Sequence, residues 1–203
     1  MKQFCSIATY DEASAIEELR RQEYEAHPSI ILINPAVLEW SSADNESLVL
    51  AAWDGSACVA TMRGKVIRTL SDAEHAIESP LDCIPMAFPA LLLGRAATSS
   101  DWQGRGLNSL LRFHFLRLAL LQGFASLIGE TNVGAPRLRL LDTLGWRSYP
   151  GISVGSILGT HGNSVIVLDL TENGTRALSV LEERTHEIAV QFPWIGEEPK
   201  LLL

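Results

Sequence analysis

Apolar residues recur along the chain with two different periods, and these periods divide the sequence into strands and helices. Short apolar runs bounded by turn residues indicate strands, whereas apolar residues three and four positions apart indicate helices. Strands are predicted at residues 4–9, 47–53, 56–64, 90–98, 124–130, 146–157 and 163–170. Helices are predicted at residues 11–27, 71–78, 106–122, 136–145 and 175–192, and the second of these lies inside a long loop, residues 69–88.

Two local patterns predict how these elements connect. Asp54 and Gly55 lie between two strand-like runs, and an Asp-Gly pair in that setting is typical of an antiparallel hairpin. From Ala90 to Glu130 the order is strand, helix, strand, which is a βαβ unit. The two strands of this unit are therefore expected to be parallel, with a right-handed crossover.

The predicted helix from Gly106 to Gln122 is apolar on two sides. One apolar stripe suits the sheet, and a second stripe, formed by Phe113, Leu116 and Leu120, requires another cover. The C-terminal helix is one candidate cover, and a second subunit in a homodimer is the other. The expected division of the chain is a main domain, residues 1–170, followed by a C-terminal helical extension and tail, residues 171–203.

Composition narrows the class of protein. The 203 residues are 47% hydrophobic and 20% charged, which is typical of a globular domain. The net charge of −8 argues against nucleic-acid binding but does not exclude a small anionic ligand. Cys5, Cys58 and Cys83 fit neither a disulfide framework nor a zinc site. Reduced thiols, no metal, no membrane contact and a cytoplasmic location are expected.

The loop Gln103–Asn108 places glycines directly before the long helix. Gly104 and Gly106 let the backbone approach a ligand closely and offer the first helical N–H groups to a phosphate. The loop lacks the lysine of a Walker motif and the third glycine of a dinucleotide fingerprint. A diphosphate cradle is one interpretation, and a tight turn into a packed helix is the other.

The stretch "LLLGRAATSSDWQGRGLNSLL" resembles the core motif of the GNAT acyltransferase superfamily, although Asn108 stands where that family usually has Gly or Ala. "ETNVGAPRLRLLDTLGWRSY" is similar to a later motif of the family, with Trp146 in place of Phe. The resemblance implies an α/β (α+β) fold with a mixed, mostly antiparallel sheet, a central parallel strand pair and flanking helices. It assigns cofactor binding to Ala96, Thr98, Gln103, Gly104, Arg105, Gly106, Leu107, Asn108 and Asn132.

The same resemblance implies an N-acyltransferase that moves an acyl group, with acetyl expected, from a coenzyme A thioester to the amine of a small molecule. Many members carry a tyrosine that protonates the leaving thiolate, and Leu141 occupies that position here. Glu130, at the end of a predicted parallel strand, is the candidate general base, although it also fits a solvated or capping carboxylate. His114 has the helical spacing of a core residue.

A second resemblance, to N-acyl-homoserine lactone and N-acyl amino acid synthases, covers the N-terminal half of the chain. Arg21, Tyr24, Asp44, Arg63 and Arg95 fall near functional or structural polar positions of that group, while its usual acidic residue is replaced by Leu92. The resemblance implies substrate binding by Arg95, Arg63 and Tyr24. It also implies acyl carrier protein as an alternative acyl donor.

The reference pKa values of amines favour a small acceptor. At pH 7.5, deprotonating a lysine side chain costs about 4 kcal/mol, whereas an α-amine costs well under about 1 kcal/mol. Three functions remain open: a coenzyme A-dependent N-acyltransferase, an N-acyl synthase that uses acyl carrier protein, and a non-catalytic module that binds acyl-coenzyme A.

Overall fold

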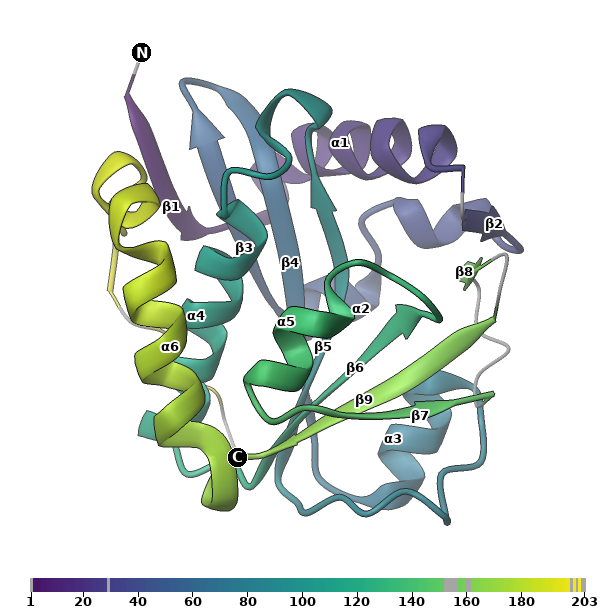
Figure 1. Ribbon diagram of the computed structural model, residues 1–203. Helices are drawn as coiled ribbons and strands as arrows, with labels where there is room; N and C mark the ends of the chain where they lie inside the picture. The colour runs from purple at the N-terminus through teal and green to yellow at the C-terminus, as the bar shows by residue number, and fades with distance from the viewer. Residues whose placement is uncertain are drawn as a thin grey trace.

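A computed structural model describes residues 2–28, 30–151, 157–159, 162–197, 199 and 201. A seven-stranded sheet with the order β1-β3-β4-β5-β6-β9-β7 forms its centre, and β2 and β8 make a separate pair (Figure 1). The strands are β1 (Gln3–Ile7), β2 (Ile30–Leu32), β3 (Leu48–Asp54), β4 (Ala57–Ile67), β5 (Ala90–Thr98), β6 (Ser126–Asn132), β7 (Arg147–Pro150), β8 (Ile157–Gly159) and β9 (Asn163–Asp169). The α-helices are α1 (Ala13–Ala26), α2 (Ser42–Asn45), α3 (Leu70–Ile77), α4 (Leu107–Leu121), α5 (Leu138–Thr143) and α6 (Leu170–Gln191), with 3-10 turns η1 (Tyr10–Glu12), η2 (Pro35–Leu38) and η3 (Ser100–Trp102).

Neighbouring strands of the large sheet are antiparallel except for β5 and β6, which are parallel. The expected mixed, mostly antiparallel sheet with one central parallel pair is therefore confirmed. The hairpin between β3 and β4 turns at Gly55, whose φ of +66° suits a residue without a Cβ atom.

Helices cover both faces of the sheet (Figure 1). Successive residues of a strand point to opposite faces, so β3 shows which helices lie where. Val49 and Ala51 pack with Ile16 of α1, whereas Leu50 belongs to the core formed with α4 and α6. α3 covers the same face as α1, near the other end of the strands, where Ile77 packs against Ile128. Because β3 is covered on both sides, its apolar run is continuous.

The second apolar stripe of α4 is covered by α6, which lies beside it (Figure 1). Leu116 is almost fully buried, and Leu120 approaches Gly174 so closely that a Cβ atom there would lie 2.7 Å from its Cδ2 atom. The C-terminal helix therefore supplies the cover that the sequence required. The buried residues of α6 belong to the same core as α4, and the division of the chain at residue 170 stays a prediction.

The segment after α6 returns to the first strand, a course that the sequence pattern does not predict. The N–H of Cys5 donates to Pro193 O at 2.9 Å, and the N–H of Ile195 donates to Cys5 O at 2.8 Å. Farther on, Gln122 of α4 bonds the backbone of both Pro199 and Leu201. The tail thus covers the outer edge of β1 and runs back along α4.

Several elements differ from the predicted ones, and α6 begins at Leu170, five residues earlier than predicted. α5 begins at Leu138, because the N–H groups of Ala135 and Leu138 close turns before it. β2 and α2 were not predicted, since both are too short to show a period. The predicted strand at residues 146–157 begins as β7, and its residues 152–156 lie outside the described part of the chain.

The three cysteines are free. Burial raises the pKa of the Cys5 and Cys58 thiols to about 12, and only the thiolate form is a strong nucleophile. Cysteine catalysis by these two residues is therefore excluded at neutral pH. None of the helices within the described ranges is long and apolar enough to cross a membrane.

Candidate active site

Strands β5 and β6 pair along only part of their length. Their parallel pairing ends at Leu93 and Gly129, while β5 continues to Thr98 and β6 continues to Asn132. The carboxyl ends of the two strands are therefore separated. Open α/β sheets bind ligands at the carboxyl ends of their strands. We refer to this separation as the strand gap.

The strand gap begins at a β-bulge. Gly94 and Ala97 of β5 pair with Arg63 and Thr61 of β4. Gly94 and Ala97 are separated by two residues, whereas Thr61 and Arg63 are separated by one, so β5 carries one extra residue. Arg95, inside the bulge, has a φ of +53°, which is uncommon for a residue other than glycine. The extra residue bends β5 where it leaves β6. Strained backbone of this kind clusters at functional sites.

The glycine loop lies just beyond the carboxyl end of β5. Gly104 and Gly106 have φ values of +75° and +92°, and Gly106 is the N-cap residue of α4. A Cβ atom at Gly104 would meet no other atom within 4 Å, so the backbone there faces open space. No side chain in the described chain caps the helix, which leaves its first N–H groups available to an anion. The loop therefore has the geometry of an anion-binding site at a helix N-terminus.

Side chains from α1 and α6 hold this loop in place. Glu23 of α1 accepts hydrogen bonds from the N–H of Ser100 and from Gln103 Nε2, both at 2.8 Å. Trp102 packs edge-on against Phe192 after α6, and the guanidinium of Arg105 lies 4.9 Å from the centre of the Trp102 ring. The Gln103 side chain is thus engaged by protein, and its N–H also donates to Ser100 O at 3.4 Å, so the ligand-facing N–H groups of the loop are those that follow Gln103.

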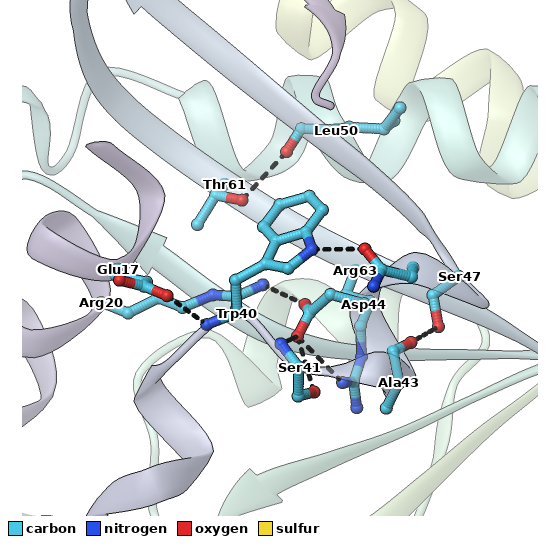
Figure 2. Close-up of polar contacts among 11 residues, drawn as sticks. Glu17, Arg20, Trp40, Ser41, Ala43, Asp44, Ser47, Leu50, Thr61 and Arg63 are labelled. Carbon is cyan, nitrogen blue, oxygen red and sulfur yellow. Dashed lines mark hydrogen bonds and ion pairs between the residues drawn. The ribbon is translucent and has the colours of Figure 1, made fainter. Parts of the chain in front are cut away.

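A buried ion pair connects α1 to α2 on the face of the sheet covered by α1 (Figure 2). Arg20 Nη2 donates to Asp44 Oδ1 at 2.7 Å, and the two side chains are 0% and 2% exposed. The second carboxylate oxygen of Asp44 accepts from the N–H and hydroxyl of Ser41 and lies 3.8 Å from Arg63 Nη1. One carboxylate therefore serves two arginines.

Arg95 joins this group, and we call Arg20, Arg63 and Arg95 the arginine cluster. Burial, together with the charge of Arg63, lowers the pKa of Arg95 to about 10. Burial alone would raise the pKa of Asp44, but the hydrogen bond and charge of Arg20 and the charge of Arg63 hold it below its usual value. Three positive charges thus face a single negative charge.

The arginine cluster leaves several buried N–H groups unused. Within the described residues, Arg20 Nε and Nη1, Arg63 Nη1 and Arg95 Nη1 have no hydrogen-bond partner. Buried polar groups normally have partners, and a buried cation needs an anion or acceptor nearby. The cluster therefore has buried donors and positive charge in excess of the acceptors that the described protein residues supply.

Tyr24 and Arg137 approach each other across the strand gap. Tyr24 Oη donates to Ala96 O, inside the bulge of β5, at 3.1 Å. Arg137 Nε donates to Thr131 Oγ1, near the end of β6, at 2.8 Å. Burial raises the pKa of the Tyr24 hydroxyl, while the charges of Arg137 and of the arginine cluster oppose that rise. A phenol and a guanidinium, each attached to a different strand, therefore lie at the mouth of the gap.

α4 and the segment after α5 pack on the face of the sheet opposite α1. The guanidinium of Arg112 lies 5.4 Å from the centre of the Trp146 ring. Burial lowers the pKa of Arg112 to about 9, with a further contribution from the charge of Arg137. Leu141 is 2% exposed and belongs to the same apolar core as Trp146. The position at which many GNAT proteins carry a tyrosine is therefore part of the core here.

Glu130 is exposed and lies on the face of the sheet covered by α1 and α3. Its partner on β9 is Val165, which packs in the core beneath α3. Arg63 occupies the same face, because its partner Val49 packs against α1. The candidate base and the arginine cluster therefore share one face, at the end of the sheet where β5 and β6 separate.

The remaining predicted cofactor residues surround the loop and the gap. Thr98 O accepts from Gln103 Nε2 at 3.2 Å, Leu107 is buried beneath the loop, and Asn108 is half-buried in the first turn of α4. Asn132 lies at the end of β6, where its side chain contacts Gly159 of β8. The structure thus places these residues between the loop and the end of β6, and their role in cofactor binding stays a prediction.

Sequence reasoning did not identify Arg20, Arg112 or Arg137 as candidate site residues. Arg21 was assigned to the polar group, but it is exposed and pairs with Glu18, whereas its neighbour Arg20 faces the core. Helical spacing could have shown this, because Arg20 follows Ile16 by four residues. Arg112 gave no comparable pattern, since its partner Trp146 comes from a distant segment, and Arg137 lies just before α5, where the pattern predicted helix instead.

Several solved structures share this architecture. A coenzyme A-dependent acyl-homoserine lactone synthase, BjaI, solved with SAM and isopentyl-CoA, is 16% identical, with 98% of this chain and 95% of that chain covered and a TM-score of 0.64. FeeM, an N-acyl amino acid synthase from uncultured soil microbes, is 14% identical, with 85% and 94% covered and a TM-score of 0.62. The ribosomal-protein-S18-alanine N-acetyltransferase from Escherichia coli is 16% identical, with 82% and 93% covered and a TM-score of 0.55.

These similarities show that the chain has the fold of the GNAT acyltransferases. No protein-family model and no curated protein sequence matches it. Because identity stays at or below 16% in these three comparisons, the chemistry of this chain has to be argued from its own residues.

Proposed function

We propose that this protein is an N-acyltransferase that moves an acyl group from a coenzyme A thioester to the amine of a small molecule bearing a carboxylate. The observation that carries the proposal is the strand gap, which opens beside an uncapped glycine loop on one side and the arginine cluster on the other. The loop supports the donor, and the cluster supports the acceptor. An α-amino acid combines the required amine and carboxylate in one small molecule.

The donor half of the proposal rests on the loop and the gap. The N–H groups at the start of α4 would hold the diphosphate, and the space between β5 and β6 would admit the thioester arm. When bound, the thioester supplies an activated acyl group. Acetyl is the acyl group we propose, because Trp146 and Leu141 fill the core behind the gap.

The acceptor half rests on charge. The arginine cluster has unused N–H donors and excess positive charge, and a bidentate arginine–carboxylate contact is among the strongest hydrogen-bonded pairs in proteins. Glu130, on the same face, is the proposed general base that removes a proton from the attacking amine, directly or through water. An exposed carboxylate suits an α-amine as its proton donor, because an α-amine loses its proton near neutral pH.

The donor is tested by thermal shift with acetyl, medium-chain and long-chain acyl-coenzyme A. A ligand at 100 times its dissociation constant adds about 2.7 kcal/mol to stability, which is easily measured. Gly104→Ala should abolish this shift, because its methyl group projects into the space before the loop. Gly123→Ala is the matched control: Gly123 also has a φ of +75°, and a Cβ atom there would also meet no other atom within 4 Å, but it lies at the far end of α4.

The acceptor is tested by thiol release across a panel of amino acids, their amides and simple amines. The proposal expects amino acids to react and their amides to react far less, with the preference reduced in Arg95→Met. Glu130→Gln should lower kcat/KM by about 100- to 10,000-fold with little change in donor affinity. Equal rates with acids and amides would contradict the carboxylate, and full activity in Glu130→Gln would remove that residue from the mechanism.

Two alternatives are separated by the same assays. Transfer from an acylated carrier protein but not from any coenzyme A thioester would identify the carrier protein as the donor. Donor binding without thiol release from any amine would identify a non-catalytic acyl-coenzyme A-binding module.

A further inference from the structure

Acyl transfer from a thioester needs a proton at the departing sulfur, and the usual GNAT position cannot supply it here. Leu141 is apolar and buried in the core beside Trp146. The side chains at the strand gap include one that carries an ionisable proton and is neither a carboxylate nor an arginine, namely Tyr24. Its helix lies on the opposite face of the sheet from α5.

We infer that Tyr24 is the general acid of the acyl transfer and donates the proton of its hydroxyl to the departing thiolate from the α1 face of the gap. The inference rests on the proposed function and adds a catalytic residue to it.

The position of the Tyr24 hydroxyl favours this role. Tyr24 Oη is held 3.1 Å from Ala96 O in the bulge, where β5 has already left β6. On the other side of the gap, Arg137 is tied to Thr131 of β6 and is close enough to influence the Tyr24 hydroxyl. The hydroxyl is therefore attached to β5 beyond the point where its pairing with β6 ends, beside the path proposed for the thioester arm.

The positive charges around Tyr24 also favour this role. A tyrosine that donates its proton becomes a phenolate, which is costly in a buried place unless positive charges surround it. Arg137, Arg95, Arg20 and Arg63 all act to stabilise the phenolate, and Asp44 is the carboxylate that partly offsets them. Burial nevertheless raises the pKa of Tyr24, so the hydroxyl holds its proton at neutral pH until an acceptor forms.

The hydrogen bond to Ala96 also suits this role. A main-chain carbonyl is a neutral acceptor, whereas a departing thiolate carries a full negative charge and accepts more strongly. The hydroxyl proton can therefore turn from Ala96 O to the sulfur when charge develops there. Until that moment the carbonyl fixes the phenol at the gap.

The step balances in atoms and electrons. The amine nitrogen attacks the thioester carbonyl and forms the new C–N bond, while Glu130 accepts a proton from that nitrogen. The C–S bond breaks, its electron pair stays on sulfur, and Tyr24 gives its proton to that sulfur. The products are an amide, free thiol, protonated Glu130 and a Tyr24 phenolate. Proton transfer through water from Glu130 to Tyr24 restores the starting state.

The test compares Tyr24→Phe with Tyr149→Phe, using acetyl-coenzyme A and the best amino acid of the panel. Tyr24→Phe keeps the ring and should lower kcat by about 100-fold or more, the range typical of general acids, with the donor KM changed less than about threefold. Tyr149→Phe removes a hydroxyl from β7, which β9 separates from β6 in the sheet, and should retain wild-type kcat. The melting temperature of Tyr149→Phe should match the wild type, and that of Tyr24→Phe should fall by about 1–6 °C, because this variant loses one hydrogen bond but keeps the ring.

A series of Tyr24 analogues with different phenol pKa values distinguishes proton donation by Tyr24 from a purely structural role. Fluorotyrosines of increasing acidity at position 24 should change kcat systematically with phenol pKa, which a purely structural ring would not do. A kcat in Tyr24→Phe within about threefold of wild type, or a rate independent of phenol acidity, would overturn the inference. If the wild-type protein releases no thiol with any amine, the proposed function itself fails, and the role of Tyr24 fails with it.

Discussion

The ion pair between Arg20 and Asp44 predicts a large and specific loss of stability on replacing Asp44 by Asn. Both side chains are essentially inaccessible to solvent, and the 2.7 Å contact is the only hydrogen bond to the Arg20 guanidinium in the described chain. Asp44→Asn keeps the size of the side chain and a carbonyl oxygen for Ser41. It removes the charge that compensates Arg20 and Arg63.

The magnitude follows from burial. Removing one partner of a buried ion pair leaves an uncompensated charge and typically costs about 3–5 kcal/mol. For a chain of this length, each kcal/mol shifts the melting temperature by about 2–4 °C, so the expected fall is about 6–20 °C. Urea denaturation would give the free energy of unfolding, and calorimetry would give the melting temperature.

The control is the exposed pair between Arg147 and Glu172, whose side chains are 62% and 58% exposed. Glu172→Gln should change stability by less than about 0.5 kcal/mol, since exposed ion pairs contribute little. The double variant Arg20→Met with Asp44→Leu should be more stable than Asp44→Asn, because it removes both charges of the buried pair together. Equal stability of Asp44→Asn and wild type would refute the argument.

Acid should weaken the pair as well. The folded pKa of Asp44 lies below its unfolded value, so its stabilising contribution is complete above the ordinary aspartate pKa of about 3.9. That contribution is lost as pH falls through the lower, folded pKa. The stability difference between wild type and Asp44→Asn should therefore shrink only in this acidic range.

Three further predictions concern stability and turnover. Burial, with the charge of Arg117, lowers the pKa of His114 to about 4, so the free energy of unfolding should fall by up to about 3 kcal/mol as pH falls from about 6.5 to about 4. Urea denaturation of His114→Gln should show a free energy of unfolding that depends less on pH over this range. Gly64→Ala would drive a methyl group into the buried Phe115 ring and should cost about 1–3 kcal/mol, with partial recovery in Gly64→Ala with Phe115→Leu; an unchanged melting temperature would contradict this packing. Leu141→Tyr should lower the melting temperature without raising kcat, and a large gain in thiol release would show that only the usual acid was missing.

Sequence patterns predicted the sheet well, because its strands have strong local periodicity. The parallel pair followed from one strand-helix-strand unit, and the hairpin followed from Asp54-Gly55. The bulge at Arg95 had no such pattern, since an arginine with positive φ looks like any other strand residue in a sequence. Its conformation is set by how β4 and β5 pair.

The candidate site was predictable only in part. The glycine loop and Glu130 lie next to elements with clear patterns. Their positions at the carboxyl ends of β5 and β6 could therefore be predicted from the sequence. Arg20 and Asp44 are 24 positions apart, and their pairing depends on how α1 and α2 pack. The contact of Arg137 with β6 could not be predicted, because Pro136 indicated the start of a helix. The helix begins two residues later, at Leu138.

Glu23 and Tyr24 are consecutive residues of α1, yet they contact different parts of the candidate site. Glu23 holds the glycine loop through Ser100 and Gln103, whereas Tyr24 holds the bulge at Ala96. A turn of helix moves as one body, so a displacement of α1 alters both contacts together. Thermodynamic linkage then requires reciprocity: by whatever factor a ligand at the loop changes affinity at the arginine cluster, a ligand at the cluster changes affinity at the loop by the same factor.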